Sequence, residues 1–266
     1  MHPRIEPYMS IQHTTSQRGV SVEQIGVKPL VVVTWWREVV FALAEAAGAL
    51  PSPHWLYGER QPFFTGAYQG QPVCFVQMPV GAPGTVLIME EMIACGAKAF
   101  LGLGMAGGLQ PSSPLGALIV PTTCISEEGT STHYPLDGMP ARADPQLSAH
   151  LAECALELGL PAATGPHWTT DAPFRELVSK IEAYREQGVL GVDMETSAMF
   201  TLAQYRQVRA ANLLVVSDEV WHEWRPGFGG ETLRQALLDA QQVILRAIAT
   251  LNTENTEKNH GAHGDF

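Results

Sequence analysis

The chain has 266 residues, and 45% of them are hydrophobic, which is enough to bury a substantial core. The formal net charge is −11 and the 16 lysine and arginine residues are scattered, so the basic face that nucleic-acid-binding proteins need is excluded. No apolar run approaches the roughly 20 residues that span a bilayer, and no signal-peptide core is visible. We therefore expect a cytoplasmic protein that binds neither nucleic acid nor membrane.

Patterns typical of strands alternate with patterns typical of helices along most of the chain. A continuous β-branched run at 30–34 opens this order and predicts a strand buried on both faces. The strands are expected at residues 30–34, 63–68, 73–77, 99–103, 118–120, 162–168 and 210–217. The helices are expected at residues 37–47, 86–95, 145–158, 174–187, 195–205 and 231–251. This alternation predicts an α/β fold with a parallel sheet.

The two ends of the chain differ from this pattern. Residues 1–26 are mostly polar and are expected to form an N-terminal arm rather than a core element. Residues 252–266 are polar, with glycine and asparagine, and predict a disordered tail. Nothing between them marks a boundary, so a single domain is expected over residues 27–251.

A glycine-rich segment, residues 102–108, matches the G-x-G-x-x-G fingerprint of dinucleotide-binding proteins. That fingerprint needs a helix to begin at its third glycine, whereas Pro111 and Pro114 follow here and another apolar strand comes next. We therefore expect these glycines to let the backbone approach a ligand or a second strand closely. No organic cofactor is expected.

Metal binding is not expected either. The four cysteines are far apart and form no C-x-x-C pair, so we expect them to be small buried side chains in a reducing compartment. They are Cys74, Cys95, Cys124 and Cys154.

An acidic pair in an apolar segment is the first candidate site. Asp193 and Glu195 lie within residues 191–200, an otherwise small and apolar run. A buried carboxylate is costly unless something binds it. Glu195 offers two oxygens to the hydroxyls of a vicinal diol, and Met194 offers a soft face to a sugar ring. For Asp193 we favour a structural role, in which it complements the dipole of the helix that begins here.

Asp218 is the second candidate, because it ends an apolar strand. Ligands of open α/β sheets bind just outside the carboxyl ends of strands, and a partly buried carboxyl there can serve as a general acid. A turn or helix N-cap aspartate is the structural alternative. His222 and Arg225 follow closely and are expected to hold the Asp218 carboxyl, whereas Trp224 is expected to be a core or interface aromatic.

Several segments occur together in an order and spacing that resemble a known family. They are residues 64–70, 104–109, 128–131, 192–195 and 216–218. Through them the chain, from about 30 to 251, resembles the nucleoside phosphorylases, the family of hexameric purine nucleoside phosphorylases, uridine phosphorylases and methylthioadenosine nucleosidases. The resemblance implies a single α/β domain with a central mixed, partly barrel-like sheet flanked by helices. It also implies a homo-oligomer, either a dimer or a trimer of dimers, that cleaves the N-glycosidic bond of a nucleoside.

The same resemblance assigns roles to individual residues. Met194 and Glu195 match the ribose-binding pair, in agreement with the diol argument. Asp218 matches the acid that protonates purine N7 in the purine-cleaving branch. Phe174 lies near the aromatic residue that stacks on the base, and His13 resembles an N-terminal histidine that reaches the 5′-hydroxyl in a neighbouring subunit.

The phosphate-binding residues depart from the family pattern. Phosphorylases hold phosphate with an arginine and a serine or threonine at positions where this chain has Gly102 and Met105. Arg37, Arg60 and Gly104 remain as phosphate-binding candidates. Each lost charged hydrogen bond costs on the order of 1.5 to 3 kcal/mol, so two lost ligands would lower phosphate affinity by several powers of ten.

Three functions follow from this pattern. The first is phosphorolysis, with inorganic phosphate as co-substrate and with free base and ribose 1-phosphate as products; purine is favoured and uridine is possible. The second is hydrolysis, in which Glu38 after the first strand activates water, although a glutamate at a helix start is often only exposed. The third is a nucleoside-binding protein without catalysis.

Overall fold

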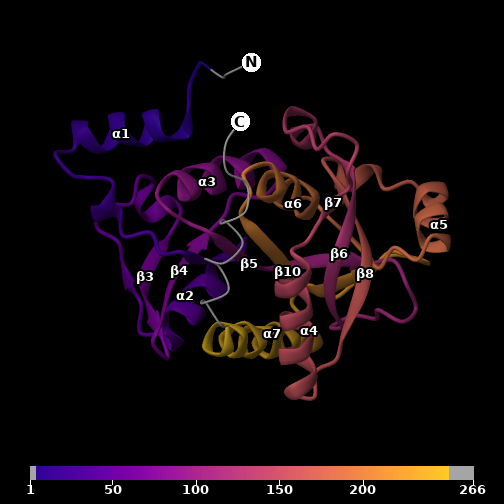
Figure 1. The fold of residues 1–266 in the computed structure, drawn as a ribbon. Coiled ribbons are helices and arrows are strands. Elements are labelled where there is room, and N and C mark those ends of the chain that lie inside the picture. Colours follow the sequence, from indigo (N-terminus) through magenta and orange to yellow (C-terminus); the bar gives the residue numbers. More distant parts are fainter. Residues whose placement is uncertain (1–3, 252–266) are drawn as a thin grey trace.

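A mixed sheet of 11 strands forms the centre of the protein in the computed structural model, which describes residues 4–251 (Figure 1). The strands are β1 (Leu30–Thr34), β2 (Leu50–Pro51), β3 (Phe63–Tyr68), β4 (Gln71–Gln77), β5 (Ala99–Gly108), β6 (Leu118–Glu127), β7 (Ala141–Arg142), β8 (Ala162–Thr170), β9 (Gly191–Asp193), β10 (Arg209–Glu219) and β11 (Arg225–Pro226). The tail expected at residues 252–266 lies outside the described residues.

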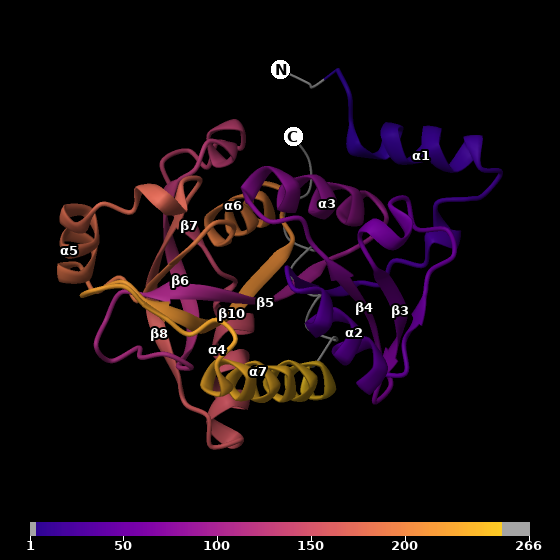
Figure 2. The ribbon, with the colours of Figure 1, turned by 180° about the vertical axis from the view of Figure 1, so that it is seen from behind.

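Part of this sheet closes on itself. β10 pairs in parallel with β5 and antiparallel with β6, while β6 continues through β8 and β9 back to β5. These five strands therefore form a ring, and β1, β4, β3 and β2 extend from β5 as an open sheet. The ring and the β3–β4 hairpin lie at opposite ends of the molecule (Figures 1 and 2). The mixed, partly barrel-like sheet expected from the family resemblance is confirmed.

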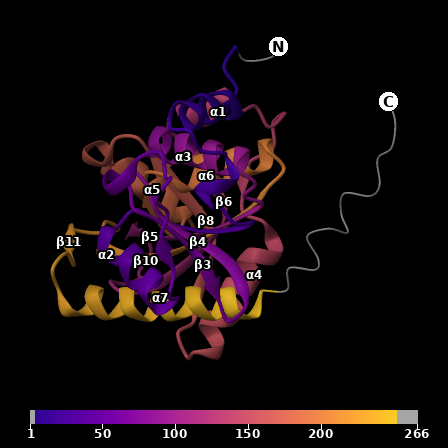
Figure 3. The ribbon, with the colours of Figure 1, turned by 90° about the vertical axis from the view of Figure 1, so that its left-hand side faces the viewer.

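Seven helices within residues 4–251 cover the sheet. They are α1 (Pro7–Gln17), α2 (Arg37–Ala46), α3 (Ala82–Ala94), α4 (Pro145–Glu157), α5 (Val178–Glu186), α6 (Thr196–Tyr205) and α7 (Glu231–Thr250). Helices α3 and α6 lie on one side, and α2, α4 and α7 lie on the other (Figures 1 and 2). The longest, α7, runs along its side of the sheet (Figure 3). None of the described helices is both long and apolar enough to cross a membrane.

Two apolar layers result from this arrangement, and β1 shows why. Successive side chains of a strand point to opposite faces. Leu30 and Val32 accordingly join the core layer with α2, α4 and α7, whereas Val31 and Val33 join the layer with α3 and α6. A strand covered on both faces requires the continuous β-branched run that the sequence shows.

The N-terminal segment differs from expectation, because it is ordered and contributes to the core. Helix α1 packs against α3, and Ile11 is fully buried there. Ile25, in a short 3-10 helix at Glu23–Ile25, is also fully buried, and both belong to the layer with α3. These two isoleucines bury apolar surface and help to dock a segment whose other residues are mostly polar.

Two further elements were placed wrongly by the sequence pattern. β5 continues to Gly108 instead of ending at residue 103, because its glycines are pressed against neighbouring strands. The helix expected over residues 174–187 is interrupted: a 3-10 turn at Pro173–Arg175 is followed by α5, which starts only at Val178. The break leaves Glu176 between two helical pieces.

Gly102 shows how tightly β5 and β10 pack, and it gives a stability prediction. A Cβ atom at Gly102 would lie 2.3 Å from Oδ1 of Asn212, whose amide is fully buried and donates to Thr196 Oγ1 at 2.8 Å. Gly102→Ala should therefore destabilise the protein by about 1 to 3 kcal/mol, measured by urea denaturation. Gly129→Ala is the matched control, because the added Cβ would have only one contact, at 3.8 Å. Equal unfolding midpoints for the two variants would contradict the prediction.

Candidate active site

A cavity of about 1120 Å³ opens where β5 and β10 end and the segment at residues 192–195 crosses them. The turn after β1, the break before α5 and the loop after β10 complete its wall. The described lining contains neither lysine nor arginine, and five of its side chains are carboxylic acids. These are Glu176, Asp193, Glu195, Asp218 and Glu223. Within residues 4–251, no three histidine, cysteine, aspartate or glutamate side chains are grouped as metal ligands.

Two backbone amides hold the side chain of Glu195, the residue directly before α6. The Gly81 N–H donates to its Oε1 at 2.6 Å, and the Met194 N–H donates to its Oε2 at 3.2 Å. Gly81 adopts a left-handed backbone (φ 96°) in the turn before α3, which favours glycine. Burial, and next the charge of Asp193, raise the pKa of Glu195 to about 8. The glutamate is therefore fixed in position, and its neutral form is favoured at neutral pH.

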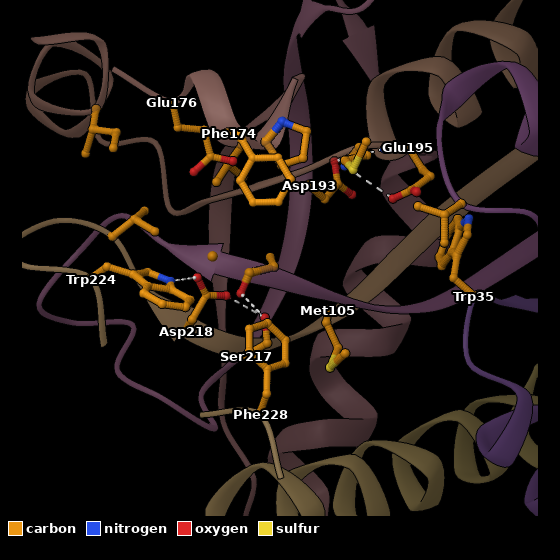
Figure 4. A pocket seen from close by; sticks show the side chains of 18 of the residues that line it. Trp35, Met105, Phe174, Glu176, Asp193, Glu195, Ser217, Asp218, Trp224 and Phe228 are labelled. Atoms are coloured by element: carbon orange, nitrogen blue, oxygen red, sulfur yellow. Dashed lines mark hydrogen bonds between the residues drawn. The ribbon is translucent and has the colours of Figure 1, made fainter. Parts of the chain in front are cut away.

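Asp193 lies beside Glu195 and has the structural role expected for it (Figure 4). It accepts hydrogen bonds from the backbone N–H of Thr196, at the start of α6, and from Thr169 Oγ1 at 2.7 Å. His167 is fully buried, with its Nε2 3.4 Å from Asp193 Oδ1. Burial by itself would raise the pKa of Asp193, but His167 and the hydroxyl donors outweigh it, and the net direction is downward. Asp193 thus places an ionised carboxylate next to Glu195.

Asp218 is held by two donors on its own side of the cavity (Figure 4). Ser217 Oγ donates to Oδ1 at 2.7 Å, and the indole N–H of Trp224 donates to Oδ2 at 2.8 Å. The register of β10 against β5 shifts between Val216 and Asp218. Such a bulge re-aims side chains, and here both Ser217 and Asp218 line the cavity although they are neighbours in one strand.

The expected partners of Asp218 were wrong. His222 Nε2 lies 3.0 Å from Glu219 Oε2, and Arg225 Nη1 lies 3.6 Å from Glu219 Oε1, so both bind the next residue of the strand. The carboxyl of Asp218 is instead bound by Trp224, which the sequence suggested as a core or interface aromatic. Spacing along the chain could not distinguish two adjacent acids that point to different sides.

Trp35 occupies the part of the site where the glycine-rich strand begins to line the cavity. Its indole N–H donates to Thr85 Oγ1 at 2.9 Å, and the six-membered ring lies against Gly104, where an added Cβ would be 3.0 Å from the ring. Met105, the next residue of β5, lines the cavity with its thioether side chain. This corner is consequently apolar.

The structure brings together four of the residues selected from the sequence. Met194, Glu195, Asp218 and Phe174 all line the cavity, although Phe174 is 99% exposed at its mouth.

The other selected residues lie outside the cavity lining. They are His13, Arg37, Glu38, Arg60 and Gly104. Arg37 donates to the backbone carbonyl of Glu59 at 3.1 Å and lies over the Phe41 ring, while Glu38 is exposed in the first turn of α2.

Sequence reasoning missed Glu176 as a site residue. Burial, and next the charge of Asp218, raise the pKa of Glu176 to about 7. The sequence pattern places Glu176 inside a regular helix, where it counts as an ordinary polar residue. The one signal in the sequence is its position two residues after Phe174, the residue expected to stack on the base.

Glu195 gives a prediction about stability and pH. The pKa of about 8 in the folded protein lies above the ordinary 4.5, so the folded state keeps a proton that the unfolded chain has lost between these values. The contribution of protonated Glu195 to the free energy of unfolding is complete below about pH 4.5 and is lost as the pH rises through about 8. Glu195→Gln keeps the neutral form at every pH. Its melting temperature should therefore fall less than that of the wild type between about pH 5.5 and about pH 8.5. Parallel curves would contradict this assignment.

Comparison with known proteins relates this site to a family. The sequence pattern of the phosphorylase superfamily matches residues 31–249. The uridine phosphorylase of Thermococcus kodakarensis is 30% identical over 68% of this chain and 69% of that protein. A DeoD-type purine nucleoside phosphorylase of Bacillus cereus is 30% identical over 59% of this chain and 68% of its own length.

A solved structure extends the likeness to the fold. The purine nucleoside phosphorylase of Toxoplasma gondii, in complex with immucillin-H, superposes with a TM-score of 0.77 and 25% identity, covering 85% of this chain and 92% of that one. The resemblance inferred from the sequence is confirmed, and the chain belongs to the phosphorylase superfamily.

Proposed function

We propose that the protein is a pentosyltransferase that cleaves the N-glycosidic bond of a nucleoside by phosphorolysis, releasing the free base and ribose 1-phosphate. The observation that carries this proposal is the presence of Glu195 and Asp218 in one cavity of a phosphorylase-superfamily chain. Both uridine and purine nucleoside phosphorylases are among its relatives. Purine is favoured because Asp218 offers a carboxyl group to the base, and uridine is possible.

Glu195 and Met194 form the ribose end of the proposed site. Glu195 is fixed by two backbone donors, which leaves its remaining lone pairs free to accept from ribose hydroxyls. Hydrogen bonds from a diol favour the charged form of a carboxyl, so substrate binding would ionise Glu195. Its negative charge would then lie near C1′ while the sugar becomes oxocarbenium-like, which stabilises the transition state.

Phe174 and Asp218 form the base end. In Figure 4 the Phe174 ring and the Asp218 carboxyl lie on opposite sides of the open space, with Trp224 and Phe228 beside Asp218. Aromatic side chains stack on a planar base. When the C1′–N bond breaks, its electron pair remains on the base, and a carboxyl group at this end can assist its protonation.

The phosphate end favours a second candidate, hydrolysis. The described lining offers no lysine or arginine to an incoming phosphate, and Trp35 and Met105 make the relevant corner apolar. Water needs no cationic subsite. Glu38, the residue expected to activate water, is exposed outside the lining. The hypothesis of hydrolysis therefore depends only on the lack of lysine and arginine in the described lining.

One experiment separates these reactions. The full-length protein is incubated with a panel of purine and pyrimidine nucleosides, with and without inorganic phosphate, and base and sugar products are quantified. Phosphate-dependent release with ribose 1-phosphate supports phosphorolysis, which would require Arg37, Arg60 or the backbone of Gly104 to reach the phosphate. Phosphate-independent release with free ribose supports hydrolysis. A melting-temperature increase with nucleoside, without any turnover, would indicate a non-catalytic binding protein.

We also propose a homo-oligomer, a dimer or a trimer of dimers, in which a second copy covers the cavity mouth. Phe174 is 99% exposed there, Val80 69% and Trp224 64%, so apolar surface surrounds the opening. His13 and Arg60 lie on the surface of the chain, where residues that serve a neighbouring site belong. Light scattering after gel filtration tests this, and a monomer would refute it.

A cytoplasmic location agrees with the free thiol of every cysteine.

A further inference from the structure

We propose that Glu176 is a second catalytic carboxyl, which together with Asp218 holds the proton that the departing base takes up. Before the step, Glu176 carries this proton. The inference rests on the proposed cleavage of nucleosides and adds to it a residue that acts on the base.

The position of Glu176 follows from the break before α5. The 3-10 turn at Pro173–Arg175 ends there, and Leu177, the residue before α5, has an extended backbone (φ −68°, ψ 138°). Glu176 is therefore turned to the cavity between two other lining residues, Phe174 and Val178. It is half-buried, and among the described residues no hydrogen bond engages its carboxyl group. A carboxyl that faces an open cavity without a partner is available to a ligand.

Asp218 is presented differently. The indole N–H of Trp224 can only donate, so Asp218 Oδ2 is an acceptor, and Ser217 donates its hydroxyl to Oδ1. Both oxygens of Asp218 are thus already engaged as acceptors. Figure 4 shows the carboxyl groups of Glu176 and Asp218 facing the same open space, with the Phe174 ring near Glu176. Of the two, Glu176 is the one whose oxygens accept no hydrogen bond within residues 4–251.

The charges around Glu176 support a proton on Glu176 and not on Asp218. Burial, and next the negative charge of Asp218, raise the pKa of Glu176 to about 7. The loop after β10 adds Glu223 and His222 to the same wall, and His222 is bound to Glu219. The one lysine of α5, Lys180, is paired with Glu127 at 2.8 Å, and the neighbouring Arg175 forms no ion pair with Glu176. No described cation is therefore bonded to Glu176 to keep it ionised, while nearby acids favour its protonated form.

The proton balance of the step is simple. The C1′–N bond breaks and its electrons pass to the base, while phosphate or water forms the new bond to C1′ and the attacking oxygen releases its proton to solvent. The carboxyl O–H of Glu176 breaks, its proton goes to a base nitrogen, and Glu176 becomes a carboxylate. Glu176 and Asp218 are then both negative and repel one another, so Glu176 regains a proton from solvent after the base leaves.

Glu176→Gln tests the role directly, because the amide keeps the shape but transfers no proton. We expect kcat for a purine nucleoside to fall by about 10² to 10⁴-fold. The wild-type kcat should decline as the pH rises above about 7, and this decline should be absent from the residual activity of the variant. Glu182→Gln is the matched control, because Glu182 is an exposed glutamate of α5 outside the cavity lining.

A direct titration gives a readout that does not depend on activity. Carbon-13 NMR of glutamate-labelled protein should place Glu176 near pH 7 in the wild type and at lower pH in Asp218→Asn, because that change removes the neighbouring charge. Wild-type kcat in Glu176→Gln, or a titration indifferent to Asp218, overturns the role of Glu176 alone. A wild-type protein that releases no base from any nucleoside overturns the proposed function and this role together.

Discussion

Replacing Asp218 by asparagine is expected to slow release of a purine base by about 10² to 10⁴-fold while the protein still folds. Asparagine keeps one acceptor oxygen, which can still receive the Trp224 N–H, and the hydroxyl of Ser217 can rotate to accept from the new amide. The local hydrogen bonds therefore survive. What is lost is the negative charge that keeps the proton on Glu176 and the carboxyl that faces the base.

This prediction is measured as kcat under saturating nucleoside, with melting temperature as the check on folding. Asp239→Asn on α7 is the matched control, because it removes the same charge outside the cavity lining. The control should retain wild-type turnover. If Asp218→Asn turns over purine nucleosides as fast as the control does, Asp218 has no part in the chemistry.

Glu195→Gln should remove recognition of the ribose diol. A hydrogen bond to a charged group is worth about 1.5 to 3 kcal/mol, so two hydroxyls together correspond to about 10² to 10⁴-fold in kcat/KM. The variant cannot restore these bonds, since its amide N–H₂ would face either the Gly81 or the Met194 backbone N–H, donor against donor. The loss should therefore be large even though glutamine fits the space.

The clearest measurement compares a ribonucleoside with its 2′,3′-dideoxy analogue. The wild type should strongly prefer the ribonucleoside, and Glu195→Gln should treat the two almost alike, because the group that reads the hydroxyls is gone. A preference that survives the substitution would assign diol recognition to other residues.

Much of the fold could be predicted because its signals are local. The β-branched run of β1 and the long amphipathic pattern of α7 each depend on side chains within one element, and both were located to within a residue. The break before α5 and the three-residue strand β9 have no such periodicity. They depend on packing against distant segments, and the local pattern therefore continued a helix through Glu176.

The candidate site could likewise be predicted only in part. Glu195 and Asp218 were found because a carboxylate at the end of an apolar segment is unusual enough to need a ligand. The cationic candidates Arg37 and Arg60 were selected by position along the chain, yet a long side chain can turn toward any nearby carbonyl, as Arg37 does. The direction of such a side chain is decided by tertiary contacts that a single sequence does not display.

The close packing of Gly102 against Asn212 has a consequence for protein engineering. The Cβ atom of an arginine at position 102 would overlap the buried Asn212 amide. The substitution should therefore destabilise the protein, whether or not the guanidinium can bind an anion. Shrinking Asn212 first would leave Thr196 without its donor. Each single step therefore carries a penalty. Substitutions at these two neighbouring positions should therefore have non-additive effects on stability.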